Sequence, residues 1–269
     1  MVDEEIAVVK LHHQYQIMSG TTLKVIGIIL MTMDHLHQMF ILQGAPNWLN
    51  WFGRPVAVIF MFLCAEGFYY TRSKKRYLVQ LLIGFLFMSL MNQILSYYLP
   101  LEAVVLINNI FSALLLAAFY MGMVDLIREG IREKRAKKIL LALGGILIPW
   151  IIGIALLLVL PNANRTTAMI LLFIPNPIFA EGGFVMVLMG ALLYILRKYR
   201  LAQAGVIAAI ALLSGLTAGP GNFQWLMVAA IIPILLYNGE RGRGGKYFFY
   251  IFYPAHIYLF YIIAWFLNK

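Results

Sequence analysis

Long apolar runs recur along the chain from Leu23 to Leu267, and they set the elements that the sequence predicts. A helix that crosses a bilayer needs about 20 mainly apolar residues. A membrane β-barrel would instead alternate polar and apolar positions, which these runs do not do. We therefore predict an all-α, polytopic membrane bundle of about nine helices. The predicted helices lie at residues 21–42, 53–71, 77–99, 103–126, 138–160, 179–197, 201–217, 223–238 and 247–267.

One apolar segment does not fit a further continuous helix. Residues 166–183 are apolar, but Pro175 and Pro177 interrupt them, and each proline lacks the amide that a helix uses. We predict a re-entrant or interfacial piece at the outer face, leading into the sixth helix. Residues 1–20 are predicted to be a cytoplasmic tail, and residues 21–269 a single transmembrane domain.

The charges support this arrangement and exclude other classes of protein. The chain is 62% hydrophobic and only 12% charged, against roughly 25% charged in soluble domains. Of its 21 Lys and Arg residues, only Arg54, Arg165 and Lys269 fall on one side of the predicted membrane. Basic residues gather on the cytoplasmic side, so the N-terminus is predicted inside and the C-terminus outside. The net charge of +10 therefore reflects membrane topology, and lipid rather than nucleic acid is the expected partner of this cell-membrane protein.

Two ionisable residues interrupt the first predicted helix near its centre. Asp34 and His35 lie near the middle of the hydrocarbon, where a charged form costs a few kcal/mol or more. His256 falls at a similar depth in the last helix. Such a pair within the membrane is functional by default. We therefore expect the first, second and ninth helices to meet around it.

Further polar residues are predicted along a track through the membrane. Asparagines in such bundles also join helices structurally, and Glu66 could equally pair with Arg72. The candidate substrate-binding residues are Arg54, Glu66, Asn108, Glu181 and His256.

A metal site is not expected. Asp34 and His37 share a helix face, whereas His35 points about 100° away from Asp34. The pair of histidines four residues apart that helical zinc sites use is missing. Cys64 is the single cysteine, which excludes a cysteine cluster.

A histidine in this position suits two kinds of chemistry. Imidazole titrates near neutrality, so His35 can take the proton from an amine or hydroxyl that attacks a thioester. Arg54 or an asparagine amide could stabilise the oxyanion. A proton-coupled transporter uses the same residue types, and composition does not separate the two.

Three segments carry a resemblance to a known family. "LKVIGIILMTMDHL" (23–36), "GRPVAVIFMFLCAEGFYYTRSKKRYL" (53–78) and "FYPAHIYLFYI" (252–262) are similar to the TraX family of integral membrane proteins. "EGGFVMVLMGALLYI" (181–195) adds weaker support. The family is named for the conjugation protein that acetylates the N-terminus of pilin. The pattern covers Asp34, His35, Arg54, Glu66, Thr71, Arg72 and His256.

The resemblance implies a membrane acetyltransferase that draws acetyl-CoA from the cytosol. It makes His35 the general base and Asp34 the residue that sets its orientation or charge, with an acetyl-histidine intermediate as another route. The acceptor, a peptide α-amine or a small molecule, would enter by Arg54 and Glu181. The phosphates of CoA would bind near Arg72, Lys74, Lys75 and Arg76.

Two other functions stay open at this point. The first is a proton-coupled transporter or flippase that uses Asp34, His35, Glu66 and His256 as a relay. The second is a non-catalytic membrane assembly factor.

Overall fold

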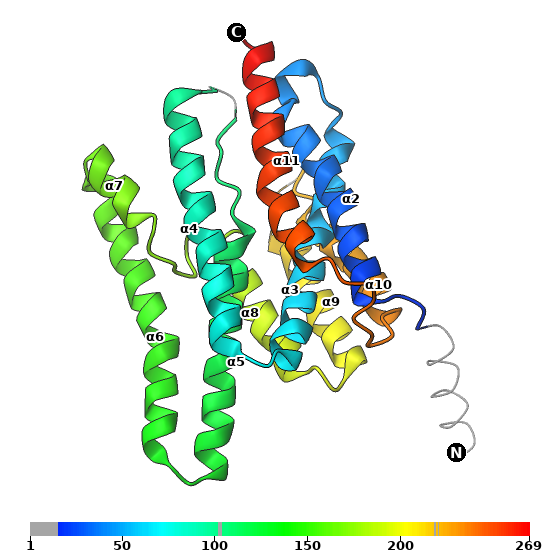
Figure 1. Ribbon diagram of the computed structural model, residues 1–269, viewed down its shortest axis with the longest axis vertical. Coiled ribbons are helices and arrows are strands. Elements are labelled where there is room, and N and C mark those ends of the chain that lie inside the picture. The colour runs from blue at the N-terminus through cyan, green and yellow to red at the C-terminus, as the bar shows by residue number, and fades with distance from the viewer. Residues whose placement is uncertain (1–15, 102–103, 218, 220) are drawn as a thin grey trace. The chain divides into compact units, whose positions relative to one another are not determined.

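The computed structural model describes residues 16–101, 104–217, 219 and 221–269 (Figure 1). These residues form α-helices and short 3-10 helices, with one isolated bridge between Met18 and Tyr237 and no β-strand among them. The predicted cytoplasmic tail lies mostly outside the described residues. The elements are α2 (Gly20–Met39), η1 (Ile41–Gln43), η2 (Asn47–Gly53), α3 (Arg54–Tyr70), α4 (Lys74–Tyr98), α5 (Ile110–Arg132), α6 (Ala136–Val159), η3 (Leu160–Asn162), α7 (Arg165–Leu171), α8 (Gly183–Ile195), α9 (Arg200–Thr217), η4 (Gln224–Ala230), α10 (Ile231–Leu235) and α11 (Lys246–Leu267).

Six of the described helical segments are long and apolar enough to cross a membrane, so the chain is a multi-pass membrane protein. They are Asn47–Tyr70, Lys74–Tyr98, Ile110–Arg132, Ala136–Asn162, Arg200–Thr217 and Tyr247–Leu267. Gly183–Ile195 and Gln224–Leu235 are apolar but shorter. Helix α2 contains Lys24, Asp34 and two histidines and is not among the six. The all-α membrane class is confirmed, whereas the count of nine spans and the sidedness of the termini stay predictions.

The helix predicted at 103–126 begins later than expected. Residues 104–109 are not helical, and α5 starts at Ile110. The amide just before α5 is bonded from a distant part of the chain: the carboxylate of Glu181 accepts the N–H of Asn109, the N-cap residue. Because hydropathy carries no information on this cap, the apolar residues before Asn109 resemble helix in the sequence.

Two proline-containing segments also differ from regular spans. The helix predicted at 223–238 is the 3-10 helix η4 followed by the single turn α10, which contains Pro233. Proline lacks the amide for a regular α-helical bond and crowds the preceding turn. Between residues 166 and 183 the chain forms the end of α7 and then turns as far as α8, so the predicted interruption is confirmed.

The chain falls into two compact units. The first holds the residues as far as Leu63 together with Lys198–Tyr261, and the second holds Cys64–Arg197 with Ile262–Lys269. The single-domain organisation stays a prediction.

In the first unit, the loop before α11 closes the N-terminus of α2. The N–H of Gly20 donates to the carbonyl of Glu240 (2.8 Å), and that of Thr21 donates to the carbonyl of Arg241 (3.1 Å). Ser19 caps the helix by accepting from the N–H of Thr22. The first amides of a helix have no partner within it, so this loop supplies the partners that α2 lacks.

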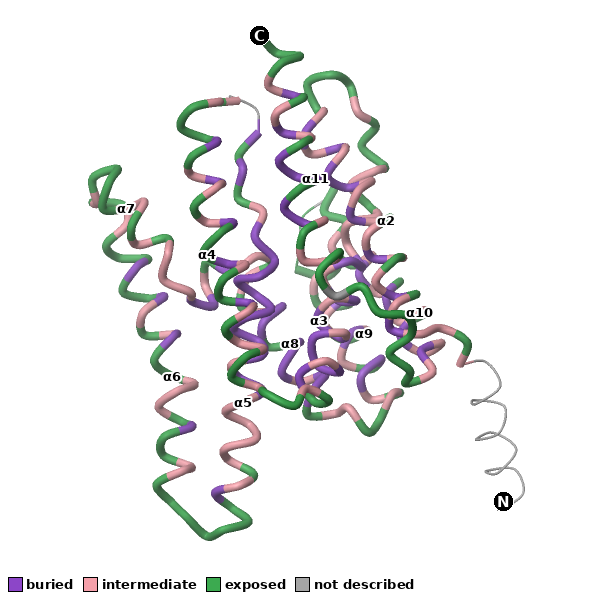
Figure 2. Tube along the Cα trace, in the orientation of Figure 1, coloured by how far each residue is buried: buried purple, intermediate pink, exposed green. Residues whose placement is uncertain are grey.

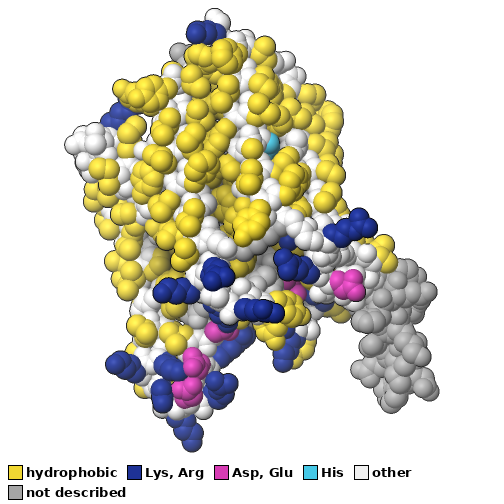
Figure 3. Space-filling view, in the orientation of Figure 1, with side chains coloured by type: hydrophobic (Ala, Val, Ile, Leu, Met, Phe, Trp, Pro, Cys, Tyr) yellow, Lys and Arg dark blue, Asp and Glu magenta, His cyan; other side chains and the backbone are white. Residues whose placement is uncertain are grey.

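In the second unit, α5 is the central helix. It packs against α4, α6 and α8, and its first half, from Ile110 to Met121, is buried almost throughout (Figure 2). Helix α6 keeps an apolar face exposed, as lipid contact requires. Charged side chains gather instead at the α5–α6 turn, where Lys138 pairs with Glu129 and Glu133 (Figure 3).

Replacing Gly84 with alanine should destabilise the second unit. A Cβ at Gly84 on α4 would lie 2.8 Å from Cγ of Phe111 on α5, so the ring must move. Overpacking of this kind costs about 1–3 kcal/mol. Gly144→Ala on α6 is the matched control, because nothing lies within 4 Å of its Cβ. Unfolding by SDS titration from mild detergent should show an earlier midpoint only for Gly84→Ala; equal midpoints would contradict the packing.

Candidate functional site

One turn of α2 in the first unit carries three buried ionisable side chains. Asp34, His35 and His37 are 7%, 4% and 6% exposed. Neighbouring residues on a helix point about 100° apart, so Asp34 and His35 must find different partners. The structure shows two separate networks, one for each.

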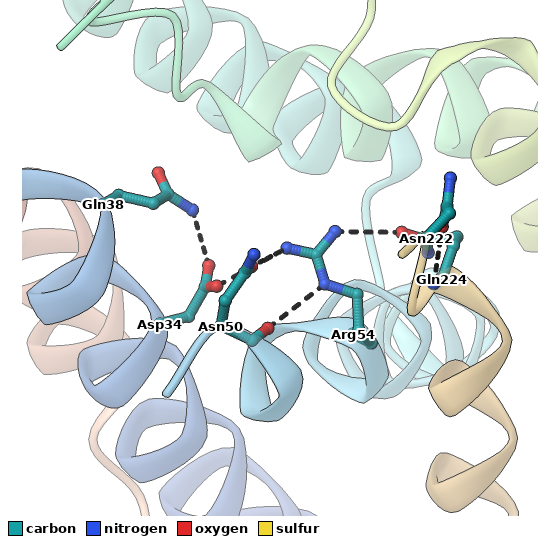
Figure 4. A network of polar contacts seen from close by, with 6 residues as sticks. All are labelled: Asp34, Gln38, Asn50, Arg54, Asn222 and Gln224. Carbon is teal, nitrogen blue, oxygen red and sulfur yellow. Dashed lines mark hydrogen bonds and ion pairs between the residues drawn. The ribbon is translucent and has the colours of Figure 1, made fainter. Parts of the chain in front are cut away.

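Asp34 belongs to a network that joins α2 to the start of α3 (Figure 4). Its Oδ2 accepts a hydrogen bond from Nε2 of Gln38, one turn later on α2, at 2.6 Å. Its Oδ1 lies 3.6 Å from Nη2 of Arg54. The carboxylate is thus held by one amide and one guanidinium, and neither contact involves His35.

Arg54 is bonded on all three of its nitrogens. Nε donates to the carbonyl of Asn50 at 3.2 Å, and Nη2 donates to Oδ1 of the same residue. Nη1 donates to Oε1 of Gln224 at 3.1 Å, and Asn222 in turn accepts from the N–H of Gln224. The guanidinium therefore ties α2, η2 and η4 together within the first unit. This engagement weakens the case for Arg54 as an oxyanion donor or as a contact for the acceptor.

The close approach of Asp34 to the chain needs a glycine. A Cβ placed on Gly53 would overlap the carboxylate of Asp34. Only a residue without a side chain lets the acid lie against the backbone that precedes Arg54. The dipeptide Gly53–Arg54 thus supplies both the space and the counter-charge for Asp34.

His35 meets His256 of α11. Nδ1 of His35 lies 2.7 Å from Nε2 of His256. Nδ1 of His256 lies 2.7 Å from the carbonyl oxygen of Phe252, one turn earlier on α11. His256, at 6% exposed, is as buried as its partner. The expected meeting of the first, second and last predicted helices is confirmed by this contact and by the Asp34–Arg54 pair.

The second histidine of α2, His37, has a different partner. Nδ1 of His37 lies 3.2 Å from the carbonyl oxygen of Ala45. Because a carbonyl only accepts, this ring donates and holds the loop that follows α2. His37 therefore serves as a local comparison for His35: both are buried on the same helix, but the ring of His35 bonds another imidazole and the ring of His37 bonds a backbone carbonyl.

Glu66 lies in the second unit beside Arg197, not beside Arg72. Its Oε2 is 4.0 Å from Nη1 of Arg197. The guanidinium of Arg197 lies over the ring of Tyr69, 3.3 Å from its centroid, and 5.3 Å from that of Tyr70. The end of α3 therefore supplies both the acid that pairs with Arg197 and the tyrosine rings that lie beside its guanidinium.

Two further candidates have structural positions. The carbonyl of Asn108 accepts from Nδ2 of Asn92 at 3.0 Å. Glu181 accepts from the N–H of Asn109, while its own N–H donates to Oγ of Ser112 at 3.1 Å. The first turn of α5 is therefore capped by a segment some 70 residues later in the chain. These contacts favour a structural role for both residues over substrate binding.

The four basic residues predicted to bind CoA divide into two kinds. Lys74 pairs with Asp125, which also accepts from the hydroxyl of Tyr194. Arg72, Lys75 and Arg76 are exposed and have no ion-pair partner among the described residues. An ion-paired lysine is a poor phosphate ligand, so the three exposed residues are the stronger candidates. No three His, Cys, Asp or Glu side chains of the described part of the chain gather to hold a metal ion.

Sequence reasoning missed several members of these networks. Gln38 lies four residues after Asp34, and that spacing places both on one helix face, so a search at this interval would have found it. Gln224 and Asp125 carry no comparable signal, because their partners Arg54 and Lys74 are far away along the chain. Asn50 lies four residues before Arg54, but in a 3-10 helix, where that spacing does not mark a shared face.

Comparisons with known proteins agree on one family. The model of the TraX family, described as TraX protein, matches residues 19–264. The chain is 26% identical over 261 residues to the probable fimbrial assembly protein FimC, serogroup H1, of Dichelobacter nodosus, covering 90% of this chain and 93% of that protein. No solved structure matches.

The Asp34–Arg54 pair should show energetic coupling. Removing one partner leaves the other charge largely buried, which is more costly than removing both. In a double-mutant cycle of Asp34→Asn, Arg54→Gln and the double variant, we expect a coupling energy of about 0.5–3 kcal/mol, measured by SDS unfolding. Additive losses would mean that the ion pair does not hold these elements together.

Proposed function

Because the chain belongs to the TraX family, we propose that it is an integral membrane acetyltransferase. It transfers an acetyl group from acetyl-CoA to the amine of a peptide at the membrane. The observation that carries this proposal is the buried imidazole of His35, whose Nδ1 is joined to Nε2 of His256.

In the proposed reaction, His35 acts as general base. The acceptor nitrogen attacks the thioester carbonyl while the other ring nitrogen of His35 takes its proton. A C–N bond forms and the C–S bond breaks. The proton then passes to the departing sulfur, which leaves as CoA. The imidazole ends the cycle neutral, as it began.

Asp34 has a positioning role in this scheme. Its contacts with Arg54 and Gln38 fix the turn of α2 that carries His35. Orientation of the base by Asp34 itself is not supported by these contacts. Its role is therefore to anchor the helix, and its charge is balanced by Arg54.

The phosphates of the donor are assigned to Arg72, Lys75 and Arg76. They are exposed and lie at the start of α4, where the helix dipole also favours an anion. The phosphates of acetyl-CoA are anions, and arginine and lysine side chains form strong charge-assisted hydrogen bonds to phosphate.

For the acceptor, we propose the N-terminal amine of a fimbrial or pilin subunit. The D. nodosus relative is named as a probable fimbrial assembly protein, and the family takes its name from a protein that acetylates pilin. Mass spectrometry of membrane and secreted peptides from cells with and without this protein would test the proposal. A difference of about 42 Da, one acetyl group, should appear at a peptide N-terminus. An unchanged peptide set combined with substrate flux in proteoliposomes lacking CoA would instead favour a transporter.

Replacing His35 with alanine should abolish acetyl transfer and leave a folded protein. His37→Ala is the matched control, because His37 is similarly buried on the same helix but its ring bonds the backbone carbonyl of Ala45 instead of His256. Removing a general base costs about 10²–10⁴-fold in rate. The measurement is release of CoA by purified protein with a peptide acceptor. A His35→Ala variant as fast as His37→Ala would remove His35 as the base.

Substitutions of the basic residues at the start of α4 should affect either donor binding or stability, depending on the residue. Arg72→Gln, Lys75→Gln and Arg76→Gln should raise KM for acetyl-CoA and leave unfolding unchanged, because their side chains are exposed. Lys74→Gln should lower stability, because it breaks the pair with Asp125. Steady-state kinetics and SDS unfolding measure the two effects. If KM stays constant in all three glutamine variants, the donor binds elsewhere.

A further inference from the structure

We propose that His256 is a positioning residue that fixes the tautomer of His35. It keeps the proton of His35 on Nδ1 and so leaves the lone pair on Nε2, the nitrogen that acts as the base. This inference rests on the proposed function for its catalytic consequence, but its structural part can be tested without any activity.

The carbonyl of Phe252 fixes the direction of both hydrogen bonds, the one it forms with His256 and the one between His256 and His35. The carbonyl oxygen of Phe252 can only accept, so Nδ1 of His256, at 2.7 Å, must carry a proton. A neutral imidazole carries one ring proton. Nε2 of His256 is therefore an acceptor.

The same reasoning then sets the protonation of His35. Its Nδ1 lies 2.7 Å from an acceptor nitrogen, so Nδ1 holds the proton and donates it. Nε2 of His35 is left with its lone pair, which is the form a general base or nucleophile needs. The tautomer of the catalytic ring is thus set by a backbone carbonyl two hydrogen bonds away.

The ring geometry fits an in-plane hydrogen bond. The two imidazole planes are inclined by 19°, and their centroids are 4.9 Å apart. With the nitrogens only 2.7 Å apart, a centroid separation this large means that the rings meet edge to edge. An N–H lies in the plane of its ring, so this arrangement aims the proton of His35 at the lone pair of His256.

Aromatic side chains of α11 hold the ring of His256 in place. The ring of Phe252 is parallel to it within 16°, at a centroid distance of 4.8 Å. Phe260 meets it edge-on at 5.9 Å and 89°, and Tyr253 does so at 6.1 Å. Because these rings lie one turn before and after His256, the helix itself builds the support.

A neutral positioning residue suits this environment. A carboxylate in the same place would add a buried charge, which is costly without a counter-charge, and Asp34, the neighbouring acid on α2, is already paired with Arg54. When His35 gains a proton, Nε2 of His256 continues to accept from it and shares the positive charge. The resting pair carries no charge, and the protonated pair carries only one.

Two substitutions at position 256 distinguish the role of His256 as a hydrogen-bond acceptor from its role in packing. His256→Gln keeps an oxygen that can accept from Nδ1 of His35, whereas His256→Leu fills space without an acceptor. His37→Leu is the control, since it removes another buried histidine of α2 and leaves the pair intact.

The activity-independent readout is the tautomer itself. In protein labelled with ¹⁵N-histidine and held in detergent, ¹H–¹⁵N correlation spectra assign the proton to Nδ1 or Nε2 of each ring. We expect His35 protonated on Nδ1 in the unaltered protein, in His256→Gln and in His37→Leu, and a shift toward Nε2 in His256→Leu. An Nε2-protonated His35 in the unaltered protein, or no change in His256→Leu, would overturn the proposal.

The kinetic consequence separates this proposal from the proposed function. We expect His256→Leu to lower kcat for acetyl transfer by about 10²-fold with KM for acetyl-CoA unchanged, a smaller loss than the roughly 10⁴-fold seen when a catalytic histidine loses an orienting carboxylate. His256→Gln should recover most of the rate. If the unaltered protein transfers no acetyl group, the proposed function fails while the tautomer measurement still decides on the pair. If it does transfer and His256→Leu is equally fast, the positioning role fails and the function stands.

Discussion

The structure depends on one constraint: polar atoms buried among apolar helices must find partners, and two successive residues of a helix cannot find the same one. Asp34 and His35 point about 100° apart, so the first turns to Arg54 and the second to His256. Each partner comes from a separate element of the first unit. The helix that carries both residues is therefore fixed on two sides, by an ion pair on one and by a neutral hydrogen bond on the other.

This division assigns different work to the acid and the histidine. Asp34, with Gln38, Gly53 and Arg54 around it, is a joint between α2, η2 and η4. His35 is connected through His256 to the backbone carbonyl of Phe252. In a familiar catalytic triad a carboxylate orients the histidine and stabilises its charged form. In the proposed site a second imidazole takes that place, which would keep the resting site free of an unpaired charge.

The sequence predicts the class of fold well and the partners poorly. Apolar runs identify the membrane helices, because length and hydropathy are properties of the segment itself. Hydropathy predicts the start of α5 too early, because the residue that caps it, Glu181, lies far along the chain. Asp34, His35 and His256 stand out because ionisable residues are costly in apolar segments, and the similar depth of His35 and His256 agrees with their contact. Asp34 can approach Arg54 because Gly53 has no side chain. No periodicity in the sequence reveals this requirement.

The most direct measurement uses the purified protein in lipid nanodiscs, with acetyl-CoA labelled in its acetyl group and a pilin-like peptide. The account predicts that the label moves to the free N-terminal amine of the peptide, with one CoA released for each acetyl group transferred, and that a peptide with a blocked N-terminus stays unlabelled. Label that remains on CoA, or that reaches the blocked peptide equally, would contradict it.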